Sequence, residues 1–228
     1  MIRLEGMTKV LRDRNGAQRV LFDGLDLAFR DDVRSVAVLG RSGSGKSTLL
    51  RILAGLDLRY DGTYVADGRQ VSRQPSAAAR FRREKVGIVT QHYDLLEDRN
   101  VLRNVLLGVE VRGVPGRRVD RKASVARARE CLELVGLGGF ERSRVNTLSG
   151  GEAQRVAIAR AIAKDPEIIL ADEPTGALDE GTEEDILQLF ARLQRDGRHM
   201  VVATHSETVA QHCDVRLLLT GGRLVSVE

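Results

Sequence analysis

A glycine-rich loop early in the chain carries the residue types that bind phosphate. Residues 40–48 read Gly-Arg-Ser-Gly-Ser-Gly-Lys-Ser-Thr and fit the pattern G-x-x-x-x-G-K-S. In such a loop the backbone N–H groups wrap the phosphates, Lys46 reaches the β- and γ-phosphates, and the Ser47 hydroxyl ligates Mg²⁺. An accidental lysine in a Gly/Ser-rich loop is the alternative, but a preceding apolar strand and a following helix supply the context that the motif needs. The predicted phosphate-binding residues are Gly40, Arg41, Ser42, Gly43, Ser44, Gly45, Lys46, Ser47 and Thr48.

A second candidate phosphate site opens a helix later in the chain. Leu148-Ser149-Gly150-Gly151-Glu152 precedes the Ala-rich residues 156–164, which have strong helix propensity. The N-terminus of a helix offers unpaired N–H groups and the positive end of its dipole, and glycines let another molecule approach. The alternative is a capping box between Ser149 and Glu152. The two interpretations are compatible, because the box can begin the helix whose N-terminus faces a phosphate.

Two adjacent acids follow a buried strand. Residues 168–171 are apolar and end at Asp172-Glu173. Open α/β sheets bind ligands at the carboxyl ends of their strands. Asp172 is therefore a candidate magnesium residue that acts through a bound water, and Glu173 can position or deprotonate an attacking water. A solvated turn, the alternative, does not explain why an apolar strand delivers both acids.

Two further polar residues also follow strands. Gln91 comes after residues 86–90, and His205 comes after the apolar residues 200–203 and Thr204. A histidine at that place can donate a hydrogen bond to a terminal phosphate. Either residue alone is more often an ordinary loop residue, so each indicates a functional site only together with the other motifs.

The elements that position these residues alternate along the chain. Strands followed by helices predict an α/β fold with a mostly parallel sheet and crossover helices. The Asp67-Gly68 turn predicts a hairpin over residues 61–71, which would join the first strands in an antiparallel layer. Residues 81–85 are interpreted as a basic connector, and residues 12–16 and 113–118 as loops. Strands are predicted at 2–10, 18–29, 33–39, 86–90, 168–171, 200–203, 215–219 and 224–227, and helices at 49–56, 100–107, 121–135, 156–164 and 182–194.

Size and composition bound the possible functions. The chain has 228 residues, a net charge of +4 and only two cysteines, Cys131 and Cys213, without metal-site spacing. A basic surface can serve nucleic acid or an anionic membrane, but the arginines are spread along the chain, which favours an anionic small ligand. The charged start of the chain does not resemble a signal peptide, and no apolar run approaches the ~20 residues of a membrane helix. If the protein acts at a membrane, we expect another chain to cross it.

Taken in order, these motifs resemble the nucleotide-binding subunit of ABC transporters. The resemblance covers essentially the whole chain, and Leu148-Ser149-Gly150-Gly151 makes it specific. It implies an α/β P-loop NTPase core with a mostly parallel sheet, an N-terminal antiparallel β layer and a helical subdomain insert. It also implies a single ABC-type domain over residues 1–228, with the core in 1–91 and 148–228 and the helical subdomain in 92–147. The motifs that carry it are residues 40–48, Gln91, Leu148–Glu152, Asp172-Glu173, Ala177-Leu178-Asp179 and His205.

The resemblance also implies a role for each motif. ATP and Mg²⁺ would be bound by the phosphate loop, with Ser47, Gln91 and Asp172 at the metal. Catalysis would involve Glu173 as the catalytic carboxylate, His205 at the γ-phosphate, Gln91 at the attacking water, and Lys46. Ser149, Gly150 and Gly151 would bind the γ-phosphate of ATP held by a second copy, with Asp179 facing that copy. Two copies would then enclose each ATP in a head-to-tail dimer.

Similarity within the family suggests a transport role. Residues 171–179 and 203–206, followed by Asp214, look similar to the subfamily that serves lipoprotein release and macrolide or antimicrobial-peptide export. We therefore expect an ATPase on the cytoplasmic face of the cell membrane that drives a separate permease, with no nucleic acid partner. ATPases of importers share much of this pattern and are the alternative. A soluble ABC ATPase acting on nucleic acid is disfavoured, because the chain has neither a long coiled-coil insert nor a second nucleotide-binding domain, and a P-loop kinase or regulatory module would not need the Leu-Ser-Gly-Gly motif.

Two positions depart from the family pattern. Leu11 stands where the family usually stacks an aromatic residue on adenine, so we expect Leu11 to cover the base without aromatic stacking and GTP to be a possible substrate. Thr90 stands before Gln91 where a phenylalanine is common, which changes the expected packing at Gln91 but leaves its chemistry unaffected.

Overall fold

The computed structural model describes residues 2–12, 15–29, 32–111, 120–176 and 178–227. It divides into two compact units, one formed by Met1–Arg82 with His199–Glu228 and the other by Arg83–Arg198. Asp13 and Arg14 of the predicted turn, the predicted loop at 113–118 and Ala177 lie outside the described residues. None of the helices in the described part of the chain has both the length and the apolar character needed to cross a membrane.

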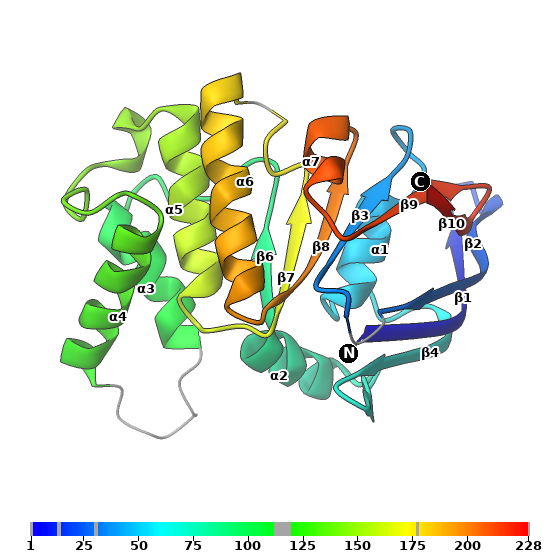
Figure 1. The fold of residues 1–228 in the computed structure, drawn as a ribbon. Coiled ribbons are helices and arrows are strands. Elements are labelled where there is room, and N and C mark those ends of the chain that lie inside the picture. The colour runs from blue at the N-terminus through cyan, green and yellow to red at the C-terminus, as the bar shows by residue number, and fades with distance from the viewer. Residues whose placement is uncertain (1, 13–14, 30–31, 112–119, 177, 228) are drawn as a thin grey trace. The chain divides into compact units, whose positions relative to one another are not determined.

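The first unit contains the predicted antiparallel layer. Strands β1 (Ile2–Arg12), β2 (Gln18–Ala28), β4 (Asp61–Ala66) and β5 (Arg69–Gln70) form a sheet in the order β2-β1-β4-β5. Figure 1 labels β1, β2 and β4 of this sheet. The β4–β5 turn at Asp67 and Gly68 has φ angles of 50° and 71°, as a two-residue hairpin turn requires. The hairpin predicted from Asp-Gly is confirmed.

A second set of strands in this unit is mostly parallel. Strand β3 (Ser35–Leu39) pairs in parallel with β8 (His199–Thr204) on one side and with β9 (Val215–Thr220) on the other. Strand β10 (Arg223–Val227) pairs antiparallel with β9. All five residues of β3 are buried, as expected for a strand with neighbours on both sides. Helix α1 (Lys46–Leu53) packs against β8, and α7 (Glu207–Gln211) packs against β3 and β8.

The second unit carries two parallel strands and a group of helices. Strands β6 (Val86–Val89) and β7 (Ile168–Asp172) are paired, with Val89 opposite Ala171. Helices α3 (Val101–Val111), α4 (Arg121–Leu134) and α5 (Gly150–Ile162) pack on one another, and α6 (Glu180–Arg195) contacts α5 (Figure 1). A 3-10 turn, Val145–Thr147, precedes α5. The apolar residues spaced as one face of a helix in α4 and its C-cap are buried: Ala128, Cys131, Leu132 and Val135.

Several predicted boundaries were wrong. Residues 81–85 are not a connector but the last part of α2 (Pro75–Lys85), because Pro75 suits the first turn and three alanines follow it. Helix α1 begins at Lys46, earlier than predicted, since it starts directly at its glycine-rich motif, whereas α5 begins at Gly150, which confirms the predicted helix start at Ser149-Gly150-Gly151. The short α7 was not predicted, because five residues are too few for a periodic pattern.

Candidate active site

The phosphate loop lies between β3 and α1 in the first unit. Gly45 is the N-cap of α1 with φ 111°, and no side chain in the described part of the chain caps this helix. A Cβ at Gly45 would lie 2.8 Å from Cε1 of Phe22, so both the backbone angle and the close approach of β2 require glycine. The N–H groups of the first turn of α1 are therefore open to an anion.

Two side chains of the loop indicate how well a phosphate would fit. The Lys46 ammonium is buried and donates a hydrogen bond to the Gly40 carbonyl at 2.7 Å. The Ser44 hydroxyl oxygen is buried and has no hydrogen-bond partner among the described residues. An unsatisfied buried hydroxyl costs roughly 1–3 kcal/mol, and a phosphate oxygen would relieve that cost. The loop therefore fits a polyphosphate.

His205 lies at the same edge of the sheet as the phosphate loop. Leu39 and Thr204 are register partners on the parallel strands β3 and β8. The chain continues from Leu39 into Gly40 and from Thr204 into His205, so both leave the sheet side by side, about 5 Å apart. His205 is exposed there. The structure thus brings together two motifs that are more than 150 residues apart in the sequence.

Leu11 lies on β1 beside the same loop. It pairs with Arg19 of β2 and is 38% exposed, which leaves an apolar side chain open to a ligand. The Arg19 guanidinium donates a hydrogen bond to the Gly43 carbonyl at 3.4 Å. This contact places the end of the β1–β2 pair next to the phosphate loop.

In the second unit, Gln91, Asp172 and Glu173 lie at or just after the ends of two paired strands. Because Val89 lies opposite Ala171, Gln91 and the two acids leave β6 and β7 at the same edge. Asp172 and Glu173 are half-buried, and Gln91 is exposed. Glu173 has φ 45°, a left-handed angle that costs a non-glycine residue about 1–3 kcal/mol and is common at functional sites.

The acidic and histidine side chains of the described residues do not form a metal site made of protein ligands alone. Within the described residues, no three His, Cys, Asp or Glu side chains gather closely enough to hold a metal ion by themselves. Mg²⁺ is usually held by one or two carboxylates together with phosphates and waters. The metal roles of Ser47 in the first unit and of Asp172 and Gln91 in the second therefore stay predictions.

Helix α5 begins at the signature motif, Ser149-Gly150-Gly151. The Ser149 hydroxyl oxygen accepts a hydrogen bond from the Glu152 N–H at 3.3 Å, and the Ser149 N–H donates to the Glu152 carboxylate at 2.7 Å. The predicted capping box is therefore present. Ser149 and Gly150 are exposed, so the same helix N-terminus can face a phosphate.

Thr182 brings Asp179 next to the signature motif. Asp179 caps α6 by accepting hydrogen bonds from the Thr182 N–H at 3.1 Å and from the Thr182 hydroxyl at 2.8 Å, and these bonds lower the pKa of Asp179. A Cβ at Gly151 would lie 2.3 Å from the Thr182 methyl carbon. Gly151 is thus required for close packing of α5 on the start of α6.

Two residues of α5 were missed by the sequence analysis. The buried Gln154 amide donates to the Pro174 carbonyl at 2.7 Å and so ties α5 to the turn after Asp172-Glu173. Arg160 donates to the backbone near Gln91. The sequence shows that both residues lie on a helix but gives no signal for partners many residues away.

Comparisons with known proteins agree with the fold and motifs. Residues 23–176 match the ABC transporter family. The chain is 42% identical, over 99% of its length, to the macrolide export ATP-binding/permease protein MacB 1/2 of Paracoccus denitrificans, and it covers 33% of that protein. It is 41% identical, over 99% of its length, to the methionine import ATP-binding protein MetN of Streptomyces griseus, and it covers 63% of that protein.

A solved structure with the same fold was described in a dimeric, post-hydrolysis state. The ATP-binding cassette MJ0796 bound to ADP and Pi superposes with a TM-score of 0.89 at 34% identity, covering 100% of this chain and 98% of that chain. The α/β P-loop fold predicted from the motifs is confirmed by this match.

Proposed function

This chain belongs to the ABC transporter family, and we propose that two copies of it hydrolyse ATP at composite sites and drive a separate membrane permease. The observation that carries the proposal is that one chain has two helix N-termini suited to phosphate. The first, α1, begins inside its own phosphate loop, and the second, α5, begins at the signature motif, in which Ser149 and Gly150 are exposed. We infer that the second binds the γ-phosphate of an ATP held by the other copy.

The chemistry proposed for each residue follows from its position. Lys46 exchanges the Gly40 carbonyl for a phosphate oxygen, and the Ser44 hydroxyl gains the partner that the described residues do not give it. The half-buried Glu173 accepts a hydrogen bond from the attacking water and takes its proton, while Gln91 orients that water. His205 donates a hydrogen bond to the γ-phosphate. Mg²⁺, with Ser47, Gln91 and Asp172 around it, would neutralise the phosphate charge.

ATP holds the two copies together in the proposed dimer. The γ-phosphate joins the phosphate loop of one copy to the signature motif of the other, and hydrolysis removes that link. Because ATP and ADP then differ in their affinity for the closed dimer, turnover shifts the population between two states. Two states of the cassette pair are what a permease needs in order to alternate between conformations.

We propose that the transport direction is export or release from the membrane, and that the chain acts at the cytoplasmic face of the cell membrane. The support is the residue pattern at 171–179 and 203–206 and the similarity to the MacB protein. Import is the second candidate, because the chain is nearly as similar to MetN. Reconstitution with the cognate permease in vesicles, followed by the direction of ATP-dependent substrate movement, separates the two.

Replacing the proposed base tests the hydrolysis mechanism. Glu173→Gln should retain ATP binding, form an ATP-dependent dimer in light scattering, and lose about 10²–10⁴-fold in kcat, because the amide cannot take a proton. Glu133→Gln is the matched control, since Glu133 is an exposed acid of α4, and its kcat should be that of the wild type. Undiminished turnover of Glu173→Gln would remove Glu173 from the mechanism.

A further inference from the structure

Helix α5 is joined to the segment that follows β6 through Arg160. The two terminal nitrogens of the guanidinium donate hydrogen bonds to neighbouring carbonyls, Nη1 to Asp94 at 2.5 Å and Nη2 to Tyr93 at 2.7 Å. The side chain is half-buried; burial lowers the pKa of Arg160, and the nearby Asp94 carboxylate opposes that shift. Two short, charge-assisted bonds in the fork geometry of arginine make this a strong link that lysine cannot reproduce.

The segment held by Arg160 has an unusual backbone. Tyr93 and Asp94 have φ angles of 59° and 47°, so two successive non-glycine residues are left-handed. Each such residue costs about 1–3 kcal/mol and persists only where surrounding contacts impose it. The Thr90 hydroxyl supplies one such contact by donating to the Asp94 carboxylate at 2.8 Å. Gln91 lies between these fixed residues, so its backbone position depends on the contacts that hold them.

The same segment also contacts the other end of α5. A Cβ at Gly150 would lie 3.2 Å from the Tyr93 hydroxyl oxygen. The Tyr93 side chain therefore extends to the first residue of α5 while its carbonyl is bound by Arg160. The segment after β6 follows α5 from the signature motif to its last turn.

We propose that Arg160 is a positioning residue that fixes Gln91 to the signature helix α5. Its bonds to the Tyr93 and Asp94 carbonyls make Gln91 and Ser149-Gly150-Gly151 move as one body. The inference rests on the proposed function, in which Gln91 serves the ATP of its own chain and the signature motif serves the ATP of the partner. Arg160 then connects the two ATP sites of the dimer through a single helix.

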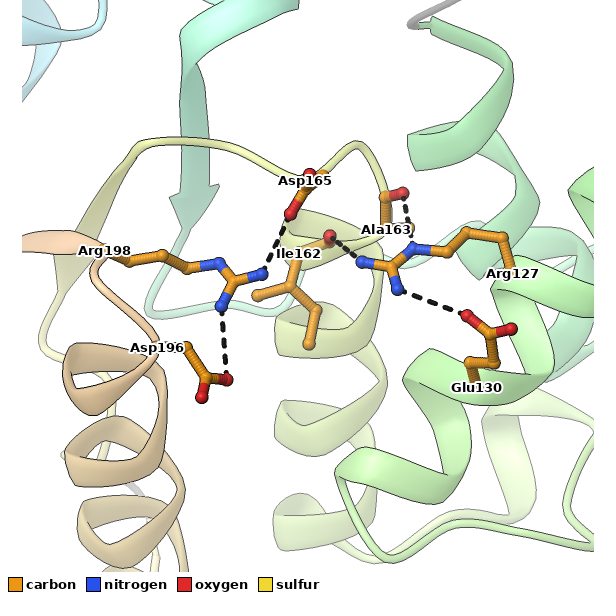
Figure 2. Close-up of polar contacts among 7 residues, drawn as sticks. All are labelled: Arg127, Glu130, Ile162, Ala163, Asp165, Asp196 and Arg198. Atoms are coloured by element: carbon orange, nitrogen blue, oxygen red, sulfur yellow. Dashed lines mark hydrogen bonds and ion pairs between the residues drawn. The ribbon is translucent and has the colours of Figure 1, made fainter.

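Arg127 provides a matched control, because it contacts the same helix, α5, from its neighbour α4. From α4 it also donates to two neighbouring carbonyls of the C-terminal end of α5, Nη2 to Ile162 at 3.4 Å and Nε to Ala163 at 3.4 Å (Figure 2). A separate ion pair, Arg198 with Asp165, lies on the other side of this end (Figure 2). Removing Arg127 therefore weakens the support of α5 without touching the Gln91 segment.

Amide hydrogen exchange tests the structural half of the proposal. In Arg160→Ala, exchange at residues 91–96 should become faster by about tenfold or more, while Arg127→Ala should leave exchange in that segment unchanged. Arg160→Lys should show an intermediate rate, since an ammonium can reach only one of the two carbonyls well. Equal exchange in the wild type and in Arg160→Ala would overturn the proposal, whether or not the protein hydrolyses ATP.

A double-mutant cycle of ATPase activity tests the functional half. Arg160→Ala should lower kcat by roughly ten- to a hundredfold, as small misplacements of a catalytic group do, whereas Arg127→Ala stays within about twofold of the wild type. If Arg160 acts through Gln91, Arg160→Ala should cause almost no further loss when added to Gln91→Ala. Equal losses from Arg160→Ala in both backgrounds would overturn the proposal while leaving the ATPase assignment intact. An inactive wild type would instead contradict the proposed function.

Discussion

Several residues of the candidate site have an unsatisfied polar group, a replaceable hydrogen bond or a strained backbone angle. The Ser44 hydroxyl is buried without a partner among the described residues, and the Lys46 ammonium is held on the Gly40 carbonyl. Glu173 has a left-handed backbone angle. Such features lower the stability of the free protein and pre-organise the groups that meet phosphate and water. At the scale of the residue, the phosphate loop is therefore shaped for a phosphate within its own unit.

The predicted contact of Leu11 with the base can be tested by changing the strength of base stacking. An aromatic ring contributes about 1–3 kcal/mol per stacked base, which leucine does not supply. Leu11→Tyr should therefore lower the KM for ATP by about tenfold, and the wild type should hydrolyse GTP with a kcat/KM close to that for ATP. Val225→Tyr, on the exposed strand β10, is the control. Steady-state kinetics in which Leu11→Tyr and the wild type share one KM would show that Leu11 does not face the base.

Because of Cys213, the stability of the folded protein should depend on pH in the alkaline range. Burial, reinforced by the charge of Asp214, raises the pKa of the thiol to about 12, whereas the pKa of a cysteine in an unfolded chain is about 8.5. The stabilisation from the protonated thiol is complete below pH ~8.5 and is lost as the pH rises towards 12. The free energy of unfolding of the wild type should fall more steeply in this range than that of Cys213→Ala, by up to about 1.4 kcal/mol per pH unit. Denaturant titrations that give both proteins the same slope would contradict this prediction.

At the scale of the element, the packing of α5 on α6 depends on Gly151. Alanine there places a methyl group against Thr182, so Gly151→Ala should lower the free energy of unfolding by about 1–3 kcal/mol despite the helix propensity of alanine. Thr182→Ser removes the obstructing methyl but keeps the hydroxyl bond to Asp179. In that background the loss on Gly151→Ala should be smaller, as measured by urea denaturation. Identical losses in both backgrounds would mean that Thr182 does not limit the packing.

The elements were more predictable from the sequence than the contacts between them. The strands before Gly40 and Asp172 were found because short apolar runs end at polar motifs, and the β4–β5 turn because Asp-Gly favours left-handed angles. Helix α2 was missed because the charged residues 81–85 were interpreted as a connector, and the helix-forming residues before them were not considered together with them. Arg160 and Gln154 were missed because their partners are backbone carbonyls, which leave no pattern in the side-chain sequence.

The positions of the motif residues could be predicted from the sequence, but their catalytic roles could not. Register explains why Gly40 and His205 leave their strands side by side in the first unit, and why Gln91 and Glu173 do so in the second. These neighbours could be expected from the sequence, since parallel strands end at the same edge. Their roles in catalysis came from the family resemblance and stay predictions until each residue is replaced.

At the scale of the whole molecule, we propose that one chain carries the parts of two half-sites. The phosphate loop and the signature motif both suit a phosphate, and the similar cassette MJ0796 was observed as a dimer with ADP and Pi. A head-to-tail pair of identical chains would give two equal sites. Each chain alone would then bind ATP but would not complete its hydrolysis.

Mixing two inactive variants tests whether each ATP site is shared between two copies. Lys46→Ala disables the phosphate loop, and Gly150→Asp places a negative charge at the signature motif while still favouring the first turn of the helix. Neither protein should hydrolyse ATP alone. An equal mixture should recover about a quarter of the wild-type activity, because half of the dimers are mixed and each mixed dimer has one intact site of two. Full activity of Gly150→Asp alone, or a mixture no more active than its components, would contradict the composite site.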